Sequence, residues 1–441
     1  MGAVIMKRVS RRVFNSFISK TTISALPLIS IIPSVKASVP SKRGARVVVV
    51  GGGWSGLSIA KYLMQENADL NVTLIERRKT FFSLPLSNLW LGGLLPVSAF
   101  NFRFEDAAKR EKYLYLNAEF SGLDRNRQRI QTNKGWISYD VLVLAPGVEY
   151  DYSSIGINDL KTTRYMKENF PAGFVSVKEQ TVILKQLQSF EKGLFVLTVP
   201  QGIYRCAASP YERACLIAAF FKRKNIKGKV VLIDPREKPA VNSEGFLSAF
   251  DELYGDTIEY LNSTMVEGVD PYRSVIKTDF DEFKFDGGAV YPRTRAARII
   301  EKFGLHDANN KQFEADIDPF NYNLRKDNQI YISGDCRPMP FSKSASVAIS
   351  EGHHIAKVIT ARLQGKSSSW VSPQSVCYSM VNSLPEEAIL SRSFYKFDDE
   401  TNQWRFDSRS KSDNTRSSVL AREMYAWASS QLQNIFGSKM F

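Results

Sequence analysis

The chain has 441 residues, which is too long for one hydrophobic core, so two or three domains are expected. Its formal net charge is +14, but the first 38 residues hold six basic side chains and no acid, and 14 minus 6 leaves +8. That remainder is spread along the chain without a basic block, so nucleic-acid binding is not indicated. Three histidines without a spaced Cys/His cluster also argue against a metal site.

The first 38 residues have the pattern of a targeting segment. A basic start precedes a mildly apolar stretch over residues 18–35, which ends in small residues suited to cleavage. Arg11 and Arg12 belong to a partial twin-arginine export signal, so we expect a periplasmic mature protein. The alternative is an N-terminal anchor helix, but Lys20 and Pro27 make the apolar stretch short for a membrane span. No later stretch reaches that length, so stable membrane insertion is not expected.

Residues 46–76 are the most informative part of the sequence. A run of four valines precedes three glycines at G-x-G-x-x-G spacing, and a helical segment and a second apolar run follow. Gly51 permits the turn, Gly53 lets the backbone approach a pyrophosphate, and Gly56 lets the helix pack against the strand. The second run ends in an acid twenty residues after the last glycine, where it can bind ribose hydroxyls. These residues predict a dinucleotide site formed by Gly51, Gly53, Trp54, Ser55, Gly56, Glu76 and Arg77.

Two further strands point to the same domain. Residues 139–147 form an apolar run that ends in Ala145, Pro146 and Gly147, and residues 112–132 suggest short strands with turns. Residues 329–335 form a strand ending in Gly334 and Asp335, whose carboxylate is suited to a ribityl hydroxyl. A probable helix over residues 344–363 would then point its N-terminus at a reduced, negatively charged flavin ring.

A second α/β unit begins near residue 181. Residues 193–199 and 229–234 both predict buried strands, but residues 200–206 contain one glycine where a phosphate loop needs more. We therefore expect a Rossmann-like unit that has lost NAD(P) binding. The tail from residue 366 begins with a linker and continues with a β-hairpin over residues 391–406. It ends in a helix over residues 418–435 whose aromatic stripe is expected to pack.

These elements predict an α/β protein with two Rossmann-like domains, the first of them discontinuous, and a small C-terminal domain. The expected boundaries are residues 1–38 for the signal, 44–160 and 288–365 for an FAD-binding domain, 161–287 for the degenerate NAD-type domain, and 366–441 for an interface domain.

The chain has four cysteines: Cys206, Cys215, Cys336 and Cys377. An exported protein meets an oxidising compartment, where disulfides persist. Four cysteines allow three full pairings, and the sequence does not choose among them. Cys206 and Cys336 both follow predicted strand ends, which face the cofactor crevice in open α/β sheets. They are candidates for a redox-active pair, against a structural bridge or two free thiols, whereas Cys377 lies in the tail, away from the motifs.

Arg205 and Cys206, followed by residues 210–214, form the most specific motif of the chain, and residues 338–340 accompany it. With these motifs the mature chain resembles the flavoprotein subunit of flavocytochrome c sulfide dehydrogenase, within the sulfide:quinone oxidoreductase superfamily. Further matching segments are residues 47–62, 86–88, 143–147, 334–344 and 377–379.

The resemblance implies bound FAD with a Cys206–Cys336 disulfide beside it. Sulfide would attack this bond, and the resulting thiolate would pass two electrons to the flavin. It implies Glu212 as the general acid/base, against a helix-surface salt bridge, and places Asn88, Lys343 and Ser344 among the FAD contacts. A c-type cytochrome subunit would accept the electrons, because this chain has no C-x-x-C-His to attach haem itself.

The sequence departs from the family pattern at two places. Residues 81–88 lack the cysteine that many members link covalently to the flavin, so non-covalent FAD is expected. Cys336 also follows Asp335 directly, where one residue usually intervenes. Two alternatives stay open: a membrane-associated sulfide:quinone reductase, which would need a more apolar tail, and a flavin-binding accessory protein of a sulfur-oxidising complex with little turnover.

Overall fold

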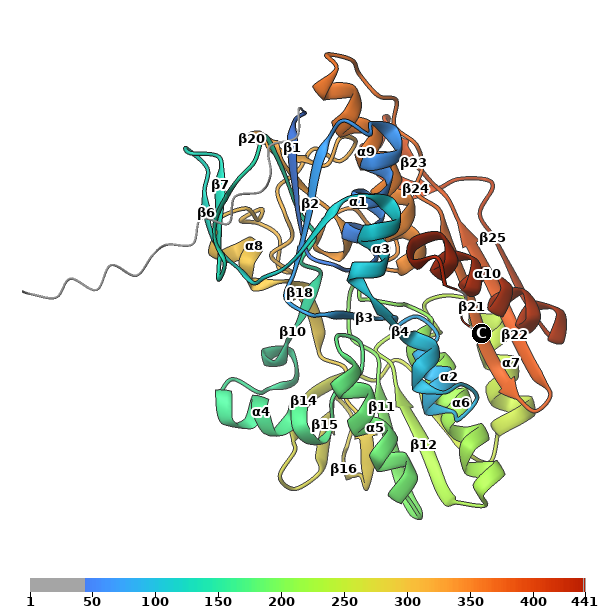
Figure 1. Cartoon of the computed structure of the whole chain (residues 1–441). Helices are drawn as coiled ribbons and strands as arrows, with labels where there is room; N and C mark the ends of the chain where they lie inside the picture. Colours follow the sequence, from blue (N-terminus) through green and yellow to red (C-terminus); the bar gives the residue numbers. More distant parts are fainter. Residues whose placement is uncertain (1–43, 439, 441) are drawn as a thin grey trace, which may run out of the picture. The chain divides into compact units, whose positions relative to one another are not determined.

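The structure is a computed structural model that describes residues 44–438 and Met440. The signal segment predicted over residues 1–38 lies outside the described residues, together with Arg11 and Arg12. Figure 1 shows the described part coloured along the chain, and the parallel sheets of two α/β units form its framework.

The first unit has a six-stranded sheet in the order β19-β20-β9-β1-β2-β5, parallel except for β19. The valines of β1 are buried on both faces, as a central parallel strand requires. Helices α1 (Trp54–Glu66) and α9 (Ala345–Leu363) pack on each other although almost 300 residues separate them (Figure 1). The strands are β1 (Arg46–Val50), β2 (Asn71–Glu76), β5 (Leu114–Asn117), β9 (Val141–Leu144), β19 (Asn323–Leu324) and β20 (Asp327–Ile332).

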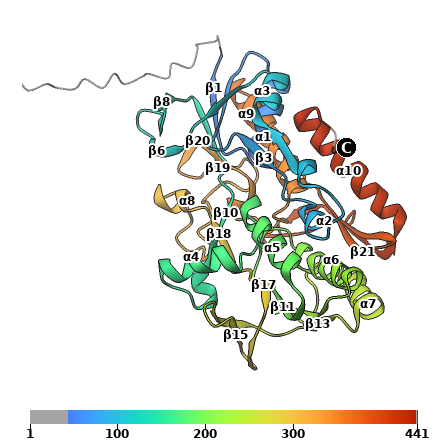
Figure 2. The same ribbon diagram turned by 60° about the horizontal axis from the view of Figure 1, so that its bottom comes forward.

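The second unit has a four-stranded parallel sheet in the order β13-β12-β11-β17. Both strands predicted here are present, as β11 (Lys192–Thr198) and β12 (Lys227–Ile233). Helices α6 and α7 pack on each other on this unit (Figure 2). Its other elements are α4 (Leu160–Asn169), α5 (Val177–Ser189), α6 (Ser209–Lys224), α7 (Ser243–Tyr254), β13 (Ile258–Leu261), β14 (Val266–Asp270), β15 (Val275–Thr278), β16 (Glu282–Lys284) and β17 (Gly287–Ala289).

A two-stranded antiparallel ribbon joins the units. β10 (Val148–Asp151) follows the first unit's β9, and β18 (Arg293–Ala296) pairs with it where the chain returns. The first unit is therefore discontinuous in sequence. Its smaller elements are β3 (Thr80–Phe82), α2 (Ser87–Leu91), β4 (Asn101–Arg103), α3 (Phe104–Glu111), β6 (Phe120–Asp124), β7 (Arg129–Thr132), β8 (Gly135–Ser138) and α8 (Arg298–Lys302).

The tail forms a three-stranded antiparallel sheet of β21 (Ser375–Ser383), β22 (Glu386–Ser393) and β25 (Lys411–Ser417), followed by α10 (Ser418–Phe436). The predicted hairpin over residues 391–406 is shorter than expected, because Ser391 belongs to β22. The hairpin consists of β23 (Tyr395–Asp398) and β24 (Gln403–Phe406). Sequence analysis assigned no strand to β21, which lies between α6 and α10. Among the described residues, no helix has the length and apolar character needed to cross a membrane.

Candidate functional site

The predicted phosphate loop has the geometry that its glycines require. Gly51 has φ +106°, and a Cβ there would lie 2.3 Å from the carbonyl oxygen of Ala145. A Cβ on Gly56 would lie 1.9 Å from the carbonyl oxygen of Gly51, so only glycine allows α1 to start this close to the strand. A Cβ on Gly53 would meet no atom within 4 Å. The loop is thus closed on the protein side and open at Gly53, where a pyrophosphate would approach.

The acid at the end of β2 lies beside this loop. Glu76 is buried, and its carboxylate accepts hydrogen bonds from Gly52 N (2.8 Å) and from Arg78 Nε (2.9 Å). Burial raises the pKa of Glu76, but the Arg78 charge and these hydrogen bonds outweigh it and hold the pKa below its usual value. Arg77, which the sequence predicted as a contact, is exposed and lies 3.6 Å from Glu119. Arg78 therefore takes the place predicted for Arg77.

Two more predicted segments meet at the loop. Gly147 has φ +75° and follows Pro146, and a Cβ on it would lie 2.9 Å from Arg205 Nη2. A Cβ on Gly334 would lie 3.2 Å from Ser55 Cβ, so the β20 end reaches the start of α1. The sequence correctly placed these segments together, because parallel strands present their carboxyl ends at one edge of a sheet.

The charged and polar side chains of the return segment are largely bound by the protein itself. Asp335 accepts from Arg205 Nε at 2.6 Å, and the Lys343 ammonium, which is buried, donates to Glu314 Oε1 and to the Asp335 carbonyl, each at 2.6 Å. Ser344 is the N-cap of α9, since its hydroxyl accepts from the N–H of Val347. Asp335 and Lys343, predicted as FAD contacts, thus form internal ion pairs in this structure.

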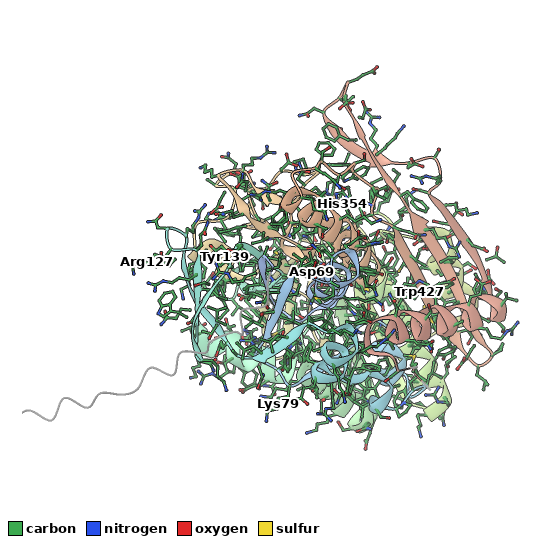
Figure 3. All side chains as sticks on the ribbon, turned by 45° about the horizontal axis from the view of Figure 1, so that its top comes forward. Asp69, Lys79, Arg127, Tyr139, His354 and Trp427 are labelled. Carbon is green, nitrogen blue, oxygen red and sulfur yellow. The ribbon has the colours of Figure 1, made fainter. Side chains whose placement is uncertain are left out.

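A narrow apolar cleft opens next to the phosphate loop. It is lined by Trp54, by the loop around Pro85, by the first turns of α9 around Ile349, and by α10 through Trp427. Figure 3 labels Trp427 on α10. The Trp54 indole N–H is buried without a hydrogen-bond partner among the described residues. An open glycine backbone, a capped helix N-terminus and an unused donor beside a cleft together fit a flavin dinucleotide.

Cys206 lies in the loop between β11 and α6. It has φ +61°, a conformation that non-glycine residues seldom adopt outside constrained sites. Its N–H donates to the Lys343 carbonyl at 2.9 Å, which ties the loop to the first unit. The side chain is half-buried, and burial together with the charge of Glu212 raises its pKa to about 11.

Cys377, which the sequence left aside, lies on β21, which packs against α6, and its thiol interacts electrostatically with that of Cys206. It is half-buried on β21 and packs against the same apolar cluster as Ala207. Its pKa is raised by burial and then by the charges of Cys206 and Glu212. Two thiols and one carboxyl thus form a cluster, which we call the thiol cluster.

The predicted disulfide between Cys206 and Cys336 is not formed in this structure. All four cysteines lie among the described residues and carry free thiols. Cys336 is fully buried in the core of the first unit, and its Sγ donates to the Ser333 carbonyl at 3.2 Å. Because Cys336 follows Asp335 directly, the turn that aims Asp335 at Arg205 sends the thiol into the core.

Glu212 is the carboxyl of the thiol cluster. It lies on the first turn of α6, is 6% exposed, and accepts from Met380 N (2.9 Å) and Asn88 Nδ2 (2.7 Å). Burial raises its pKa to about 7, against the opposing effects of Asn88, Met380 and Arg213. The alternative of a helix-surface salt bridge is excluded, since Glu212 is buried and forms no ion pair within the described chain. Asn88, predicted as an FAD contact, donates to this carboxylate in the structure.

Arg213 is a site residue that the sequence reasoning missed. It is 2% exposed and donates to Asn88 Oδ1 (3.0 Å) and to the carbonyls of Ala172 and Gly173. Within the described residues its guanidinium has no carboxylate partner, and burial lowers its pKa to about 10. Its only sequence signal was its place next to Glu212 in the specific motif.

The nucleotide position of the second unit is filled by protein groups. Asp234, which follows β12, is fully buried and accepts from the hydroxyls of Tyr211 (2.6 Å) and Tyr260 (3.0 Å). Arg236 donates to the carbonyls of Pro200 (3.1 Å) and Gly202 (2.8 Å). The acid and the loop that would bind a second dinucleotide are therefore already paired with each other through Arg236.

Two sequence families match separate parts of the chain. Residues 45–183 match the family described as pyridine nucleotide-disulphide oxidoreductase. Residues 180–292 match the family described as sulfide dehydrogenase [flavocytochrome c] flavoprotein chain, central. The two matches support the predicted superfamily.

Curated relatives are similar over most of the chain at low identity. A type II NADH:quinone oxidoreductase of Staphylococcus haemolyticus is 23% identical over 365 residues, which cover 75% of this chain and 87% of the relative. The mitochondrial sulfide:quinone oxidoreductase of Mus musculus is 22% identical over 333 residues, covering 71% of this chain and 70% of the relative.

Solved structures share the fold. The sulfide:quinone oxidoreductase of Aquifex aeolicus superposes with a TM-score of 0.73 at 16% identity, covering 90% of this chain and 92% of the other. NDH2 of Plasmodium falciparum in complex with NADH gives 0.65 at 12% identity, covering 89% and 95%. These likenesses confirm the predicted α/β fold with two dinucleotide-binding-type units.

Proposed function

We propose that this protein is an FAD-dependent oxidoreductase that oxidises sulfide, or a related reduced sulfur compound, at Cys206 and Cys377. The observation that carries the proposal is the thiol cluster: two half-buried thiols and a buried carboxyl whose pKa is about 7. A carboxyl with a pKa near neutrality is suited to accept and return protons at physiological pH. The matched families support the same reaction class.

The chemistry is a thiol–disulfide exchange. In the oxidised pair, Cys206 and Cys377 share an S–S bond, and hydrosulfide attacks one of its sulfurs. That bond breaks as a new S–S bond forms, which leaves a persulfide on one cysteine and a thiolate on the other. Glu212, in its ionised form, accepts the proton that the persulfide releases. FAD, when bound, would accept the two electrons released when the deprotonated persulfide and the thiolate join, a step that leaves the substrate sulfur between the two cysteines.

The first unit would hold FAD without a covalent bond. Gly51, Gly53 and Gly56 would hold the pyrophosphate, and Glu76 would exchange its bonds with Gly52 and Arg78 for ribose hydroxyls. The loop over residues 81–88 contains no thiol. Acid precipitation should therefore release the yellow colour into the supernatant, and colour retained in the pellet would contradict non-covalent binding.

We propose a c-type cytochrome as the electron acceptor and the periplasm as the location. Support comes from the resemblance of residues 205–214 and from the paired arginines Arg11 and Arg12. Replacing both arginines by lysine should leave the precursor in the cytoplasm. A second acceptor class, a quinone, is favoured by the apolar cleft between Trp54 and Trp427 and by the quinone reductases among the relatives.

The decisive experiment adds sulfide to the anaerobic holoprotein and follows flavin absorbance. Bleaching supports the proposal, and reoxidation by cytochrome c or by a water-soluble quinone then identifies the acceptor class. NADH should not bleach the flavin, because Asp234 and the loop at Gly202 are already paired with protein groups. No bleaching by sulfide, with any acceptor, would leave the accessory-protein alternative in its place.

A further inference from the structure

A chain of hydrogen bonds leads from Arg213 to the thiol cluster. Arg213 Nε donates to Asn88 Oδ1 at 3.0 Å. Because a guanidinium can only donate, this bond fixes which end of the Asn88 amide is the oxygen. The amide nitrogen must then point the other way, to Glu212 Oε2 at 2.7 Å and to Ser209 Oγ at 2.8 Å.

The same network reaches Cys206. Ser209, which shares the Asn88 amide, donates its N–H to the Cys206 carbonyl at 2.9 Å, and its hydrogen bonds lower the pKa of the thiol. Glu212 Oε1 is fixed independently by Met380 N at 2.9 Å. The carboxyl is therefore held at one oxygen by backbone and at the other by Asn88.

We propose that Asn88 and Arg213 are positioning residues that orient the Glu212 carboxyl in the thiol cluster and keep it able to ionise although it is buried. This inference deepens the proposed function, since Glu212 is the proton acceptor there. Neither residue needs to touch the substrate. Arg213 acts through the Asn88 amide and through its charge, which lowers the pKa of Glu212 although no ion pair joins the guanidinium to a carboxylate among the described residues.

The groups around Glu212 show why the network matters. From its own helix it faces Cys215 and Arg213, from the preceding loop Cys206, from β21 Cys377, and from α10 Tyr425. Every one of these except Arg213 is neutral or becomes negative on deprotonation. An ionised carboxylate here thus depends on Arg213 and on two donated hydrogen bonds, one of which comes from Asn88.

The test titrates Glu212 without any turnover. Difference infrared spectroscopy of the holoprotein against pH should show a carboxyl band that disappears in Glu212→Gln, with a midpoint near pH 7 in the parent. Asn88→Leu should move this midpoint upward by at least about one unit, a tenfold change in the ionisation constant. Arg213→Lys keeps the positive charge but loses the several directed N–H donors of the guanidinium. The midpoint should therefore shift upward by less than in Asn88→Leu.

Arg223→Gln is the matched control, because it also removes an arginine from α6. The Arg223 guanidinium donates to the Gly92 carbonyl and does not contact Glu212. Its midpoint should equal that of the parent. If Asn88→Leu does not fold, Asn88→Gln displaces the amide and should shift the midpoint in the same direction. An unchanged midpoint in a folded Asn88 variant would overturn the inference.

In each variant, the acid side of the pH profile of sulfide-dependent flavin reduction should shift from that of the parent by the same amount as the infrared midpoint. Because the titration itself needs no sulfide, a parent protein that fails to bleach would refute the proposed function and leave the positioning inference to be decided by the infrared result.

Discussion

The two α/β units place corresponding loops after their first strands, but the loop of the first unit is open to a ligand and that of the second is closed by protein groups. After β1, the chain is open at Gly53, and the buried acid Glu76 lies beside the loop with hydrogen bonds that a ribose can replace. After β11, Arg236 ties the loop at Gly202 to Asp234, which two tyrosines seal. The second unit retains the parallel sheet, and its loop between β11 and α6 carries Cys206. The same scaffold thus has an open dinucleotide-type loop in one unit and, in the other, a loop that is closed by protein groups and carries Cys206.

Substitution of the cysteines should have the largest effect on the rate of flavin reduction by sulfide. Cys206→Ser or Cys377→Ser should reduce sulfide-dependent flavin bleaching by more than about 100-fold, because either change removes one sulfur of the exchanging bond. FAD should stay bound, since neither residue belongs to the first loop. Stopped-flow absorbance measures the rate, and the flavin-to-protein ratio measures retention.

Cys336→Ser is the control for that prediction. Its thiol lies in the core of the first unit, so the variant should lose some stability but keep bleaching within a few-fold of the parent. The opposite pattern, with Cys336→Ser inactive and Cys377→Ser active, would support the pair that the sequence suggested, Cys206 and Cys336.

The phosphate loops can be compared by one substitution in each. Gly56→Ala places a Cβ 1.9 Å from the Gly51 carbonyl, so α1 must move and the purified protein should retain less than about a tenth of its FAD. Gly202 has φ +74° with no atom near its added Cβ, and asparagine tolerates this conformation. Gly202→Asn should therefore keep full FAD occupancy. Equal loss in both variants would contradict the assignment of FAD to the first loop.

The smallest effect concerns stability. The pKa of Glu212 rises from 4.5 to about 7 on folding, so this group stabilises the fold fully below pH 4.5 and loses that contribution as pH rises through 7. The loss is about 3 kcal/mol. Chemical denaturation at pH 5 and pH 8 measures the free energy of unfolding, which should decline less between these pH values in Glu212→Gln than in the parent. An equal decline in both proteins would show that other groups control the pH dependence of stability.

Sequence reasoning worked where one short segment carries all the information. The glycine spacing, the buried valines and the acid of residues 46–76 lie within about thirty positions, and each residue has a local steric or electrostatic task. It did not predict that Arg78 bonds Glu76, because the side-chain direction after a strand depends on the neighbouring turn. It failed at β21 because that strand is buried on both sides by segments distant in sequence.

The sequence by itself determined the fold class, and it predicted the first dinucleotide loop and a degenerate second loop. These follow from periodicity, steric need and local spacing, whereas the motif around Cys206 and Glu212 was indicated by the resemblance to a family. Only the tertiary structure decided that Cys336 is buried in the core of the first unit, that Cys377 interacts with Cys206, and that Glu212 is buried. The physical reason is distance along the chain: the groups that hold Glu212 come from Asn88 and Met380, which are 124 and 168 residues away. Packing of the tail against α6 brings them together, and no local pattern encodes which side chains then meet.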